Sequence, residues 1–490
     1  MPRAAGLGEP QANGQLSLPP CSGTTYARTI SWKDVFLMLS LVGFILVIVM
    51  VALVIRGKIA LPPILILLPT IAVLFLGLTG YLVPPKAEVA APMDIVTCFK
   101  TLQTYLGSGL SSVLNTAALF TFAVVFFNVL ADAGVFDFIV GKVMKYIGNN
   151  VSLVLLMTCL LTAISHLDGS GATTWLITAP TMLPLFNAMN ISPIVLLLYI
   201  ALVSGVENML PWTSALARVS ASTGLEARAI WSALIPAQIF GLVLLFASCF
   251  IVGPMLKKRG AGMSDDEFEK MRSGMLQTKE PTLKVSKGVL YFDIIFLVCI
   301  VICLLKGWIN TNVAFMIGLS VALIVNCKSA KEMTAQIKKH GANALNMVMI
   351  IFSIGMLVGV MKGSGMMEAM TNTLVGMMPE SMGKHLSFII AMLAVPLSMA
   401  VGSDTLYMVM APIFGNMAAA FGGSMMAAAC ACTIGACVAV NLCLVAPTPY
   451  LALGLCGVEM KDNLKYCFIP TWVLGIVLAL VATLTGAIPL

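Results

Sequence analysis

Long runs of apolar residues alternate with short polar segments over most of the chain. The longest runs cover residues 35–55, 61–83, 232–252, 289–305 and 471–488. A helix needs roughly 17–25 mainly apolar residues to cross the hydrocarbon layer of a membrane. Each run is therefore predicted to form a membrane-spanning helix. Other apolar runs are interrupted by Gly, Pro or a charged residue.

A weak internal repeat divides the chain into two halves. A small polar segment precedes an Ala-Pro pair in each half, at 169–180 and at 402–412. Farther along, Pro211 and Pro447 are each followed by a Gly-X-Glu segment. Matched landmarks in the same order indicate a duplication. With an odd number of crossings per half, the two halves run in opposite directions, which is the inverted-repeat plan of many secondary transporters.

The repeat sets the predicted domains: a flexible N-terminal tail at 1–32, a first transmembrane repeat at 33–255, a charged cytoplasmic linker at 256–287 and a second transmembrane repeat at 288–490. The predicted fold class is an all-α polytopic membrane protein. Each repeat has about five transmembrane helices and one re-entrant hairpin, with broken helices at the substrate site. Most Lys and Arg residues between the runs then fall on one side, which the positive-inside rule places in the cytoplasm. A plain twelve-crossing topology uses the same runs and stays open.

Composition narrows the class of protein. Hydrophobic residues make up 59% of the 490 residues and charged residues 10%, whereas a soluble domain carries roughly 25% charged residues. A soluble enzyme and a disordered chain are therefore excluded. The net charge of +7 is spread over the ends of the apolar runs. No basic stripe with interleaved aromatic residues is present in the sequence, so we expect no nucleic-acid binding.

Four polar breaks in the apolar pattern predict the functional site. We interpret 168–174 and 402–405 as hairpin tips, and 208–214 and 445–450 as interruptions of a helix. Unwound backbone at membrane depth is tolerated only where it is buried or lines a water-filled cavity. Helix starts attract anions, while free carbonyl and hydroxyl oxygens coordinate cations. The four breaks are therefore predicted to meet at a site for a carboxylate, with or without a cation.

The candidate residues fall into two groups. The predicted substrate-binding residues are small or polar residues of the breaks and one arginine: Gly169, Ser170, Gly171, Thr173, Thr174, Pro211, Thr213, Ser214, Arg218, Gly402, Ser403, Thr405, Pro447, Thr448 and Tyr450. The predicted coupling-ion residues are Asp168, Glu207, Asn208 and Asp404. Ionisable groups inside a membrane are costly and usually functional, although either aspartate could instead cap a helix. Glu207 could form a buried structural pair. The Arg218 guanidinium offers a fork for a carboxylate but could also face the membrane interface.

His166 lies four residues before Ser170. It could relay a proton or simply pack in the interior. The two residues also suggest an intramembrane hydrolase, but Asp168 points about 200° away from His166 on a helix and cannot orient it. A channel is disfavoured because duplicated broken helices favour a gated binding site. We therefore expect a transporter and not an enzyme.

At these breaks the chain resembles the citrate–metal–proton symporter family (CitMHS) of the ion-transporter superfamily. The resemblance covers nearly all of 33–490. Segment 166–174 is similar to the family's first tip, and 210–212 with Ala217 and Arg218 is similar to its PW…AR segment. Segments 402–404 and 449–459 resemble its second tip and the segment that ends in GVE.

The resemblance implies a multi-pass symporter of the bacterial inner (cell) membrane that takes up citrate or a related carboxylate as a complex with Mg²⁺ or Ca²⁺, coupled to protons. It implies no resident cofactor, and a homodimer with a mobile transport part. The chain departs from the family pattern at Ser170, which replaces an acidic residue, at 213–216 and at 441–443. These departures leave a second hypothesis open: a metal-independent transporter of di- or hydroxycarboxylates coupled to H⁺ or Na⁺.

Overall fold

The computed structural model describes residues 31–489 except 57, 84–89, 137, 140–148, 265–267, 269–281, 284, 307 and 445. All regular secondary structure in these described residues is helical, so the predicted all-α class is confirmed. Residues 1–30 of the predicted tail and most of the predicted linker lie outside the described residues. The division into inverted repeats with re-entrant hairpins stays a prediction.

Nine helical segments of the described chain are long and apolar enough to cross a membrane. They comprise α1 (Trp32–Arg56), α2 (Leu61–Leu78), α3 (Ile95–Asp132), α5 (Val151–Ser165) with the short η1 (His166–Asp168), α9 (Ala227–Lys258), α11 (Lys287–Lys306), α13 (Ala330–Gly363), α19 (Met425–Ala439) with η3 (Val440–Leu442), and α21 (Met460–Leu484). Three shorter apolar helices are α7 (Pro193–Glu207), α12 (Thr311–Asn326) and α16 (Leu386–Val401). The remaining helices are α6 (Gly171–Ala188), α8 (Ser214–Thr223), α14 (Met366–Met377), α15 (Glu380–Lys384), α17 (Ser403–Thr405), the π-helical turn η2 (Leu406–Met410), α18 (Ala411–Ala420) and α20 (Pro447–Cys456).

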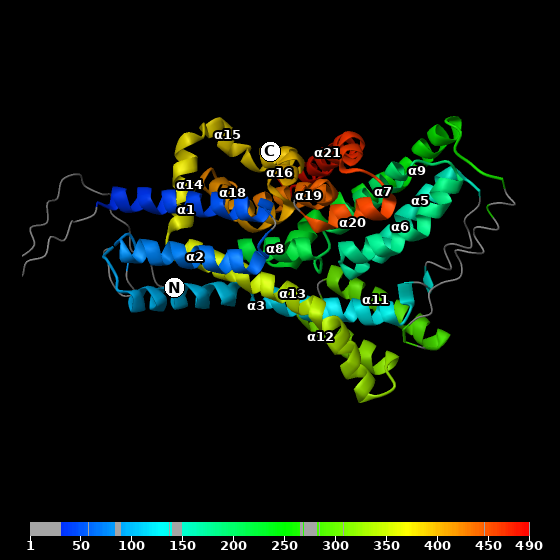
Figure 1. Cartoon of the computed structure of the whole chain (residues 1–490), viewed down its shortest axis with the longest axis horizontal. Helices are drawn as coiled ribbons and strands as arrows, with labels where there is room; N and C mark the ends of the chain where they lie inside the picture. The colour runs from blue at the N-terminus through cyan, green and yellow to red at the C-terminus, as the bar shows by residue number, and fades with distance from the viewer. Residues whose placement is uncertain are drawn as a thin grey trace, which may run out of the picture.

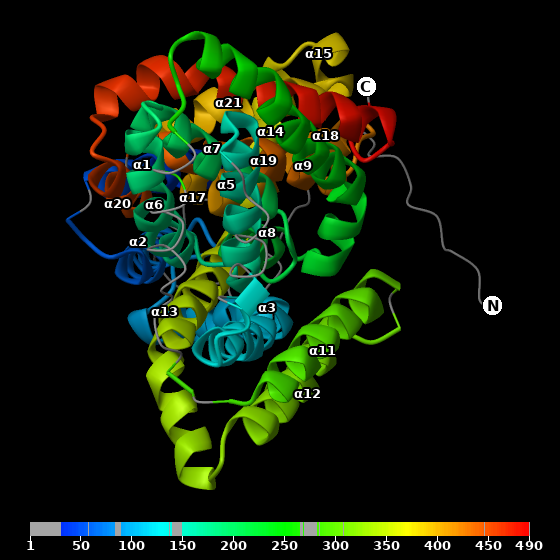
Figure 2. The same cartoon turned by 90° about the vertical axis from the view of Figure 1, so that its right-hand side faces the viewer.

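The outer helices carry apolar side chains that no part of the described chain covers. Leu37 and Ile48 on α1 and Ile251 on α9 are each at least 66% exposed. Exposed apolar surface of this extent would be unfavourable in water and is stable against lipid. Figures 1 and 2 show α1, α2 and α3 side by side, with the pair α11 and α12 beside α3.

The central helix is α19. In the membrane-spanning segment Met425–Leu442, which includes α19, 83% of the residues are buried. Its sequence is rich in Ala, Cys and Gly, so neighbouring backbones approach closely. A side chain at Gly435 would overlap Ala394 of α16, and a Cβ atom at Gly205 of α7 would lie 2.8 Å from Val438 Cα. Its cysteines are buried and reduced, which agrees with their use as small apolar residues.

A second close contact joins the long helices α3 and α13. Gly355 and Gly359 of α13 face Gly109 of α3, where an added Cβ atom would overlap the carbonyl oxygen of Gly355. A Cβ atom at Gly359 would overlap the carbonyl oxygen of Tyr105. Small residues four positions apart allow two helix backbones to approach within a membrane, where dispersion contacts drive association. This contact therefore lets the backbones of α3 and α13 pack closely against each other.

The first tip and the first interruption are fixed against each other. Gly169 joins η1 to α6 with φ of +73°, and a Cβ atom there would lie 3.1 Å from the carbonyl oxygen of Trp212. Glycine is therefore required for both conformation and space. The Ser170 hydroxyl caps α6 by accepting from the Thr173 N–H at 3.4 Å, and the Thr213 hydroxyl caps α8. Such caps fix where each helix starts.

In the second half the breaks are shorter than predicted. At the second tip, Gly402 alone is non-helical, with φ of +89°, and 403–405 already form the first helical turn. The second interruption falls between Leu442 and Pro447, so the predicted segment 445–450 is mostly helical. The reason is that proline is favoured in the first helical turn, where its missing N–H has no partner to lose. Val445 lies outside the described residues.

Candidate functional site

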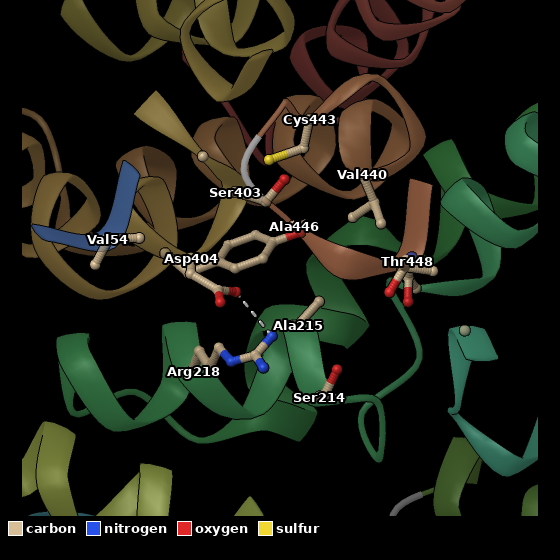
Figure 3. Close-up of a pocket in the computed structure, with 14 residues that line it drawn as sticks. Val54, Ser214, Ala215, Arg218, Ser403, Asp404, Val440, Cys443, Ala446 and Thr448 are labelled. Carbon is tan, nitrogen blue, oxygen red and sulfur yellow. Dashed lines mark ion pairs between the residues drawn. The ribbon is translucent and has the colours of Figure 1, made fainter. Parts of the chain in front are cut away.

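A cavity of about 290 Å³ lies where the two tips and the two interruptions meet. Figure 3 shows it between α8 and the second tip. All four breaks contribute to its wall. The lining residues are Val54, Gly171, Asn208, Ser214, Ala215, Arg218, Gly402, Ser403, Asp404, Tyr407, Val440, Cys443, Ala446 and Thr448.

Four helices begin at this cavity. Gly171 and Ser214 are the first residues of α6 and α8, and Ser403 starts a helix that continues without interruption to Ala420. Thr448 lies in the first turn of α20. Each helix start carries free N–H groups and about half a positive charge from the helix dipole. Their convergence makes the cavity electropositive before any side chain is considered.

Two opposite charges face each other across the cavity. Arg218 Nη1 on α8 lies 3.0 Å from Asp404 Oδ1 at the second tip, and Figure 3 shows the two side chains pointing toward one another. The Arg218 side chain is 15% exposed and that of Asp404 37%. The Arg218 Nε atom is buried and has no hydrogen-bond partner among the described residues. The Nη end of the guanidinium is therefore the part that faces the cavity and Asp404.

Hydrogen bonds hold the surrounding elements in place. His166 Nδ1 lies 2.7 Å from Thr174 Oγ1, and His166 Nε2 lies 3.1 Å from Asn208 Oδ1. The Trp212 Nε1–H donates to the carbonyl oxygen of Leu167 at 2.9 Å. His166, which the sequence left open as a packing residue or a proton relay, thus ties the first tip to the cavity-lining Asn208.

Two buried carboxyl groups lie near the cavity without lining it. Asp168 accepts a hydrogen bond from the Ser170 N–H at 2.8 Å, as expected of a residue that stabilises a turn. Glu207, at the end of α7, is 6% exposed. Its carboxyl group has no hydrogen-bond or ion-pair partner in the described part of the chain. A buried charge without a partner is unfavourable, so burial disfavours the charged form of this group.

The structure brings eight of the predicted site residues together at the cavity: Gly171, Asn208, Ser214, Arg218, Gly402, Ser403, Asp404 and Thr448. Ten others do not line it: Gly169, Ser170, Thr173, Thr174, Pro211, Thr213, Thr405, Tyr450, Asp168 and Glu207. The side chain of Pro447 lies outside the part of the chain that the structure describes. Several of these ten shape the breaks instead, as the caps and turns above show. The Tyr450 side chain is 53% exposed, and its hydroxyl donates to the carbonyl oxygen of Leu444.

Six cavity-lining residues were not predicted as site residues: Val54, Ala215, Tyr407, Val440, Cys443 and Ala446. Two of them, Tyr407 and Cys443, carry a hydroxyl or a thiol group. Tyr407 lies three residues after Asp404 and therefore on the same side of the helix; this spacing was the available signal. Cys443 lies just past the end of η3, in the segment 441–443 where the sequence departs from the family pattern. The Tyr407 hydroxyl donates to the Cys437 thiol of α19 at 3.5 Å, so this ring lies between the cavity and α19.

Within the described residues, no group of three or more His, Cys, Asp or Glu side chains could hold a metal ion. The one carboxylate that lines the cavity in this part of the chain is Asp404. Mg²⁺ and Ca²⁺ take six or more oxygen ligands. A divalent metal that enters this cavity therefore meets one charged ligand among the described residues, beside neutral side-chain oxygens.

Apolar spans around a polar cavity of interrupted helices define a multi-pass membrane transporter. The family model "Citrate transporter" matches residues 44–435, and the chain belongs to this family. It is 30% identical over 453 residues to a citrate transporter of Bacillus subtilis (strain 168), covering 92% of this chain and 100% of the relative. It is 27% identical over 462 residues to a Mg(2+)/citrate complex secondary transporter of the same organism, covering 92% and 99%.

The fold is similar to the crystal structure of the Alcanivorax borkumensis YdaH transporter, which was described as having an unusual topology. The TM-score is 0.56 at 13% identity, covering 87% of this chain and 98% of that one. Because the family consists of transporters, the chain is not an enzyme, and the hydrolase hypothesis is dropped. The resemblance and the multi-pass membrane location expected from the sequence are confirmed.

Proposed function

We propose that the chain is a secondary symporter that imports citrate, or a closely related carboxylate, as a complex with Mg²⁺ or Ca²⁺ and coupled to protons. The observation that carries the proposal is the convergence of four helix starts and the Arg218–Asp404 ion pair on one cavity. Assembly as a homodimer belongs to the same proposal.

Charge explains why a complex suits the cavity better than free citrate. Citrate carries about three negative charges at neutral pH, and a divalent metal reduces this to about one. Moving a bare trianion out of water is far more costly than moving a monoanion. The positive charge of one guanidinium and four helix starts suits a complex with a single negative charge. The Asp404 carboxylate can then contact the metal of that complex. The naming of one relative as a Mg(2+)/citrate complex transporter supports this choice.

A second candidate is metal-independent transport of a di- or hydroxycarboxylate coupled to H⁺ or Na⁺. The ion pair between Asp404 and Arg218 favours this candidate. Because Asp404 is paired, no described carboxylate at the cavity is free to bind a metal. Ser170, where the resembling family has an acidic residue, favours it for the same reason.

Uptake into proteoliposomes separates the two candidates. With the purified full-length chain and radiolabelled citrate, uptake driven by a pH gradient is expected to be about tenfold or more faster with Mg²⁺ or Ca²⁺ than with a chelator. A protonophore is expected to abolish accumulation. Equal uptake with the chelator supports the second candidate. Accumulation that requires Na⁺ shows that Na⁺ and not H⁺ is the coupling ion. No uptake of any carboxylate contradicts both.

Glu207 is the residue we expect to carry the coupling proton, because it is buried and has no described partner. Replacing Glu207 with glutamine fixes the neutral state. Uptake driven by a pH gradient is expected to fall by about tenfold or more, while citrate exchange, which moves no net proton, stays within about threefold of the wild type. Glu368→Gln, at an exposed position on α14, is the control and leaves both assays unchanged. Equal loss of uptake and exchange would contradict the assignment.

A further inference from the structure

We infer that the Arg218–Asp404 ion pair selects a metal–carboxylate complex over either free component, because the complex alone replaces both partners of the pair. The inference rests on the proposed function and adds the residues that set its specificity. In the absence of substrate, the two side chains neutralise each other across the cavity at 3.0 Å.

The pair has capacity for both parts of such a complex. The Nε atom of Arg218 is buried, so a carboxylate that enters the cavity binds the Nη end of the guanidinium, where Asp404 also binds. Ser214 lies one turn earlier on α8 and starts that helix at the cavity, which adds N–H groups on the same side. Asp404 is 37% exposed, so a cation can reach its carboxylate oxygens.

A free carboxylate or a free cation can pair with only one member of the ion pair and leaves the other member unpaired. A free carboxylate that binds Arg218 displaces Asp404, which is then unpaired and repels the bound anion. A free cation that binds Asp404 leaves Arg218 unpaired and repels it in turn. Leaving one member of a partly buried ion pair without a partner is costly. The complex places its carboxylate on Arg218 and its metal on Asp404, so both charges remain paired.

The side chains that line the cavity support the binding of metal only as part of a complex. Asp404 is the one carboxylate lining it in the described chain, and the sulfur of Cys443 is a poor ligand for hard cations such as Mg²⁺ and Ca²⁺. Free metal therefore finds one charged oxygen ligand beside neutral amide and hydroxyl oxygens, which disfavours tight binding. Metal carried by citrate arrives with most of its ligands in place and needs one more from the protein.

The test measures citrate binding to the purified, detergent-solubilised full-length chain by calorimetry, with Mg²⁺ or with a chelator. In the wild type, Mg²⁺ is expected to tighten citrate binding by about tenfold or more. In Asp404→Asn, the effect of Mg²⁺ is expected to shrink to within about twofold, and binding in the chelator to become tighter than in the wild type. Glu380→Gln removes the acid of an exposed ion pair with Lys384 and is expected to keep the wild-type Mg²⁺ effect.

A second variant covers the case in which Asp404→Asn does not fold, as judged by size-exclusion chromatography. Arg218→Gln frees Asp404, so Mn²⁺ without citrate is expected to bind about tenfold tighter than to the wild type, as measured by electron paramagnetic resonance. If the wild type shows no Mg²⁺ effect on citrate binding, the metal-complex part of the proposed function is wrong. If the wild type shows the effect and Asp404→Asn retains it, or if Mn²⁺ binding does not change in Arg218→Gln, this inference alone is overturned.

Discussion

Replacing Arg218 with glutamine is expected to reduce citrate uptake into proteoliposomes by about 30-fold or more, because truncating one partner of a partly buried ion pair costs about 2–5 kcal/mol. The lower end of that range applies, since Asp404 is 37% exposed and partly screened by water. The substitution removes the cavity's fork for a carboxylate and leaves the negative charge of Asp404 facing the anion. Arg218→Lys keeps the positive charge but loses the forked pair of donors. Its uptake should therefore lie between that of the wild type and that of Arg218→Gln.

The matched control for Arg218→Gln is Lys384→Gln. Lys384 also pairs with an acidic residue, Glu380, but both side chains are more than 60% exposed, and exposed pairs contribute about 0–1 kcal/mol. Initial rates of radiolabelled uptake, normalised to the amount of reconstituted protein, should match the wild type for the control. If Arg218→Gln transports as fast as the control, Arg218 has no role in substrate binding.

The second large effect concerns folding. Gly109→Val is expected to reduce the yield of folded, monodisperse protein by about tenfold or more, because overpacking alone costs about 1–3 kcal/mol and here the clash is with backbone. A side chain at this position overlaps the carbonyl oxygen of Gly355, which cannot move without displacing α13. The measurement is fluorescence-detected size-exclusion chromatography of detergent extracts.

Gly107 supplies the matched control on the same helix. A Cβ atom there meets nothing within 4 Å, so Gly107→Val adds the same side chain without the clash. Its folded yield should stay close to the wild type. Equal yields for the two variants would show that the close crossing of α3 and α13 is not needed for folding.

The apolar pattern was enough to predict the fold class, because lipid requires every spanning segment to be apolar and to satisfy its own backbone hydrogen bonds. The runs at 35–55 and 232–252 correspond to α1 and α9. The contact of α3 with α13 was not predictable in this way. Gly109 and Gly359 lie far apart in the chain. The spacing of glycines on one helix does not indicate which other helix it packs against.

The candidate site was predicted in part for the same physical reason. Glycine, proline and charged residues break an apolar helix wherever they occur, so Asp404 and Ser214 were recognisable from local sequence. Their convergence depends on how whole helices pack. The pairing of Arg218 with Asp404 joins the two halves of the chain, and no local pattern contains it. Boundaries at the second interruption were shifted because proline begins a helix as readily as it ends one.

The π-helical turn η2 lies directly after the second tip, between Asp404 and the α-helical part of α18. Such turns hold one residue more than an α-helical turn and occur often at functional sites. In an α-helix each residue advances the rotation by about 100°. If this turn tightened by one residue, Ser403 and Asp404 would swivel by about that angle while α18 kept its position. The π-helical turn therefore sets the direction in which Ser403 and Asp404 face relative to α18.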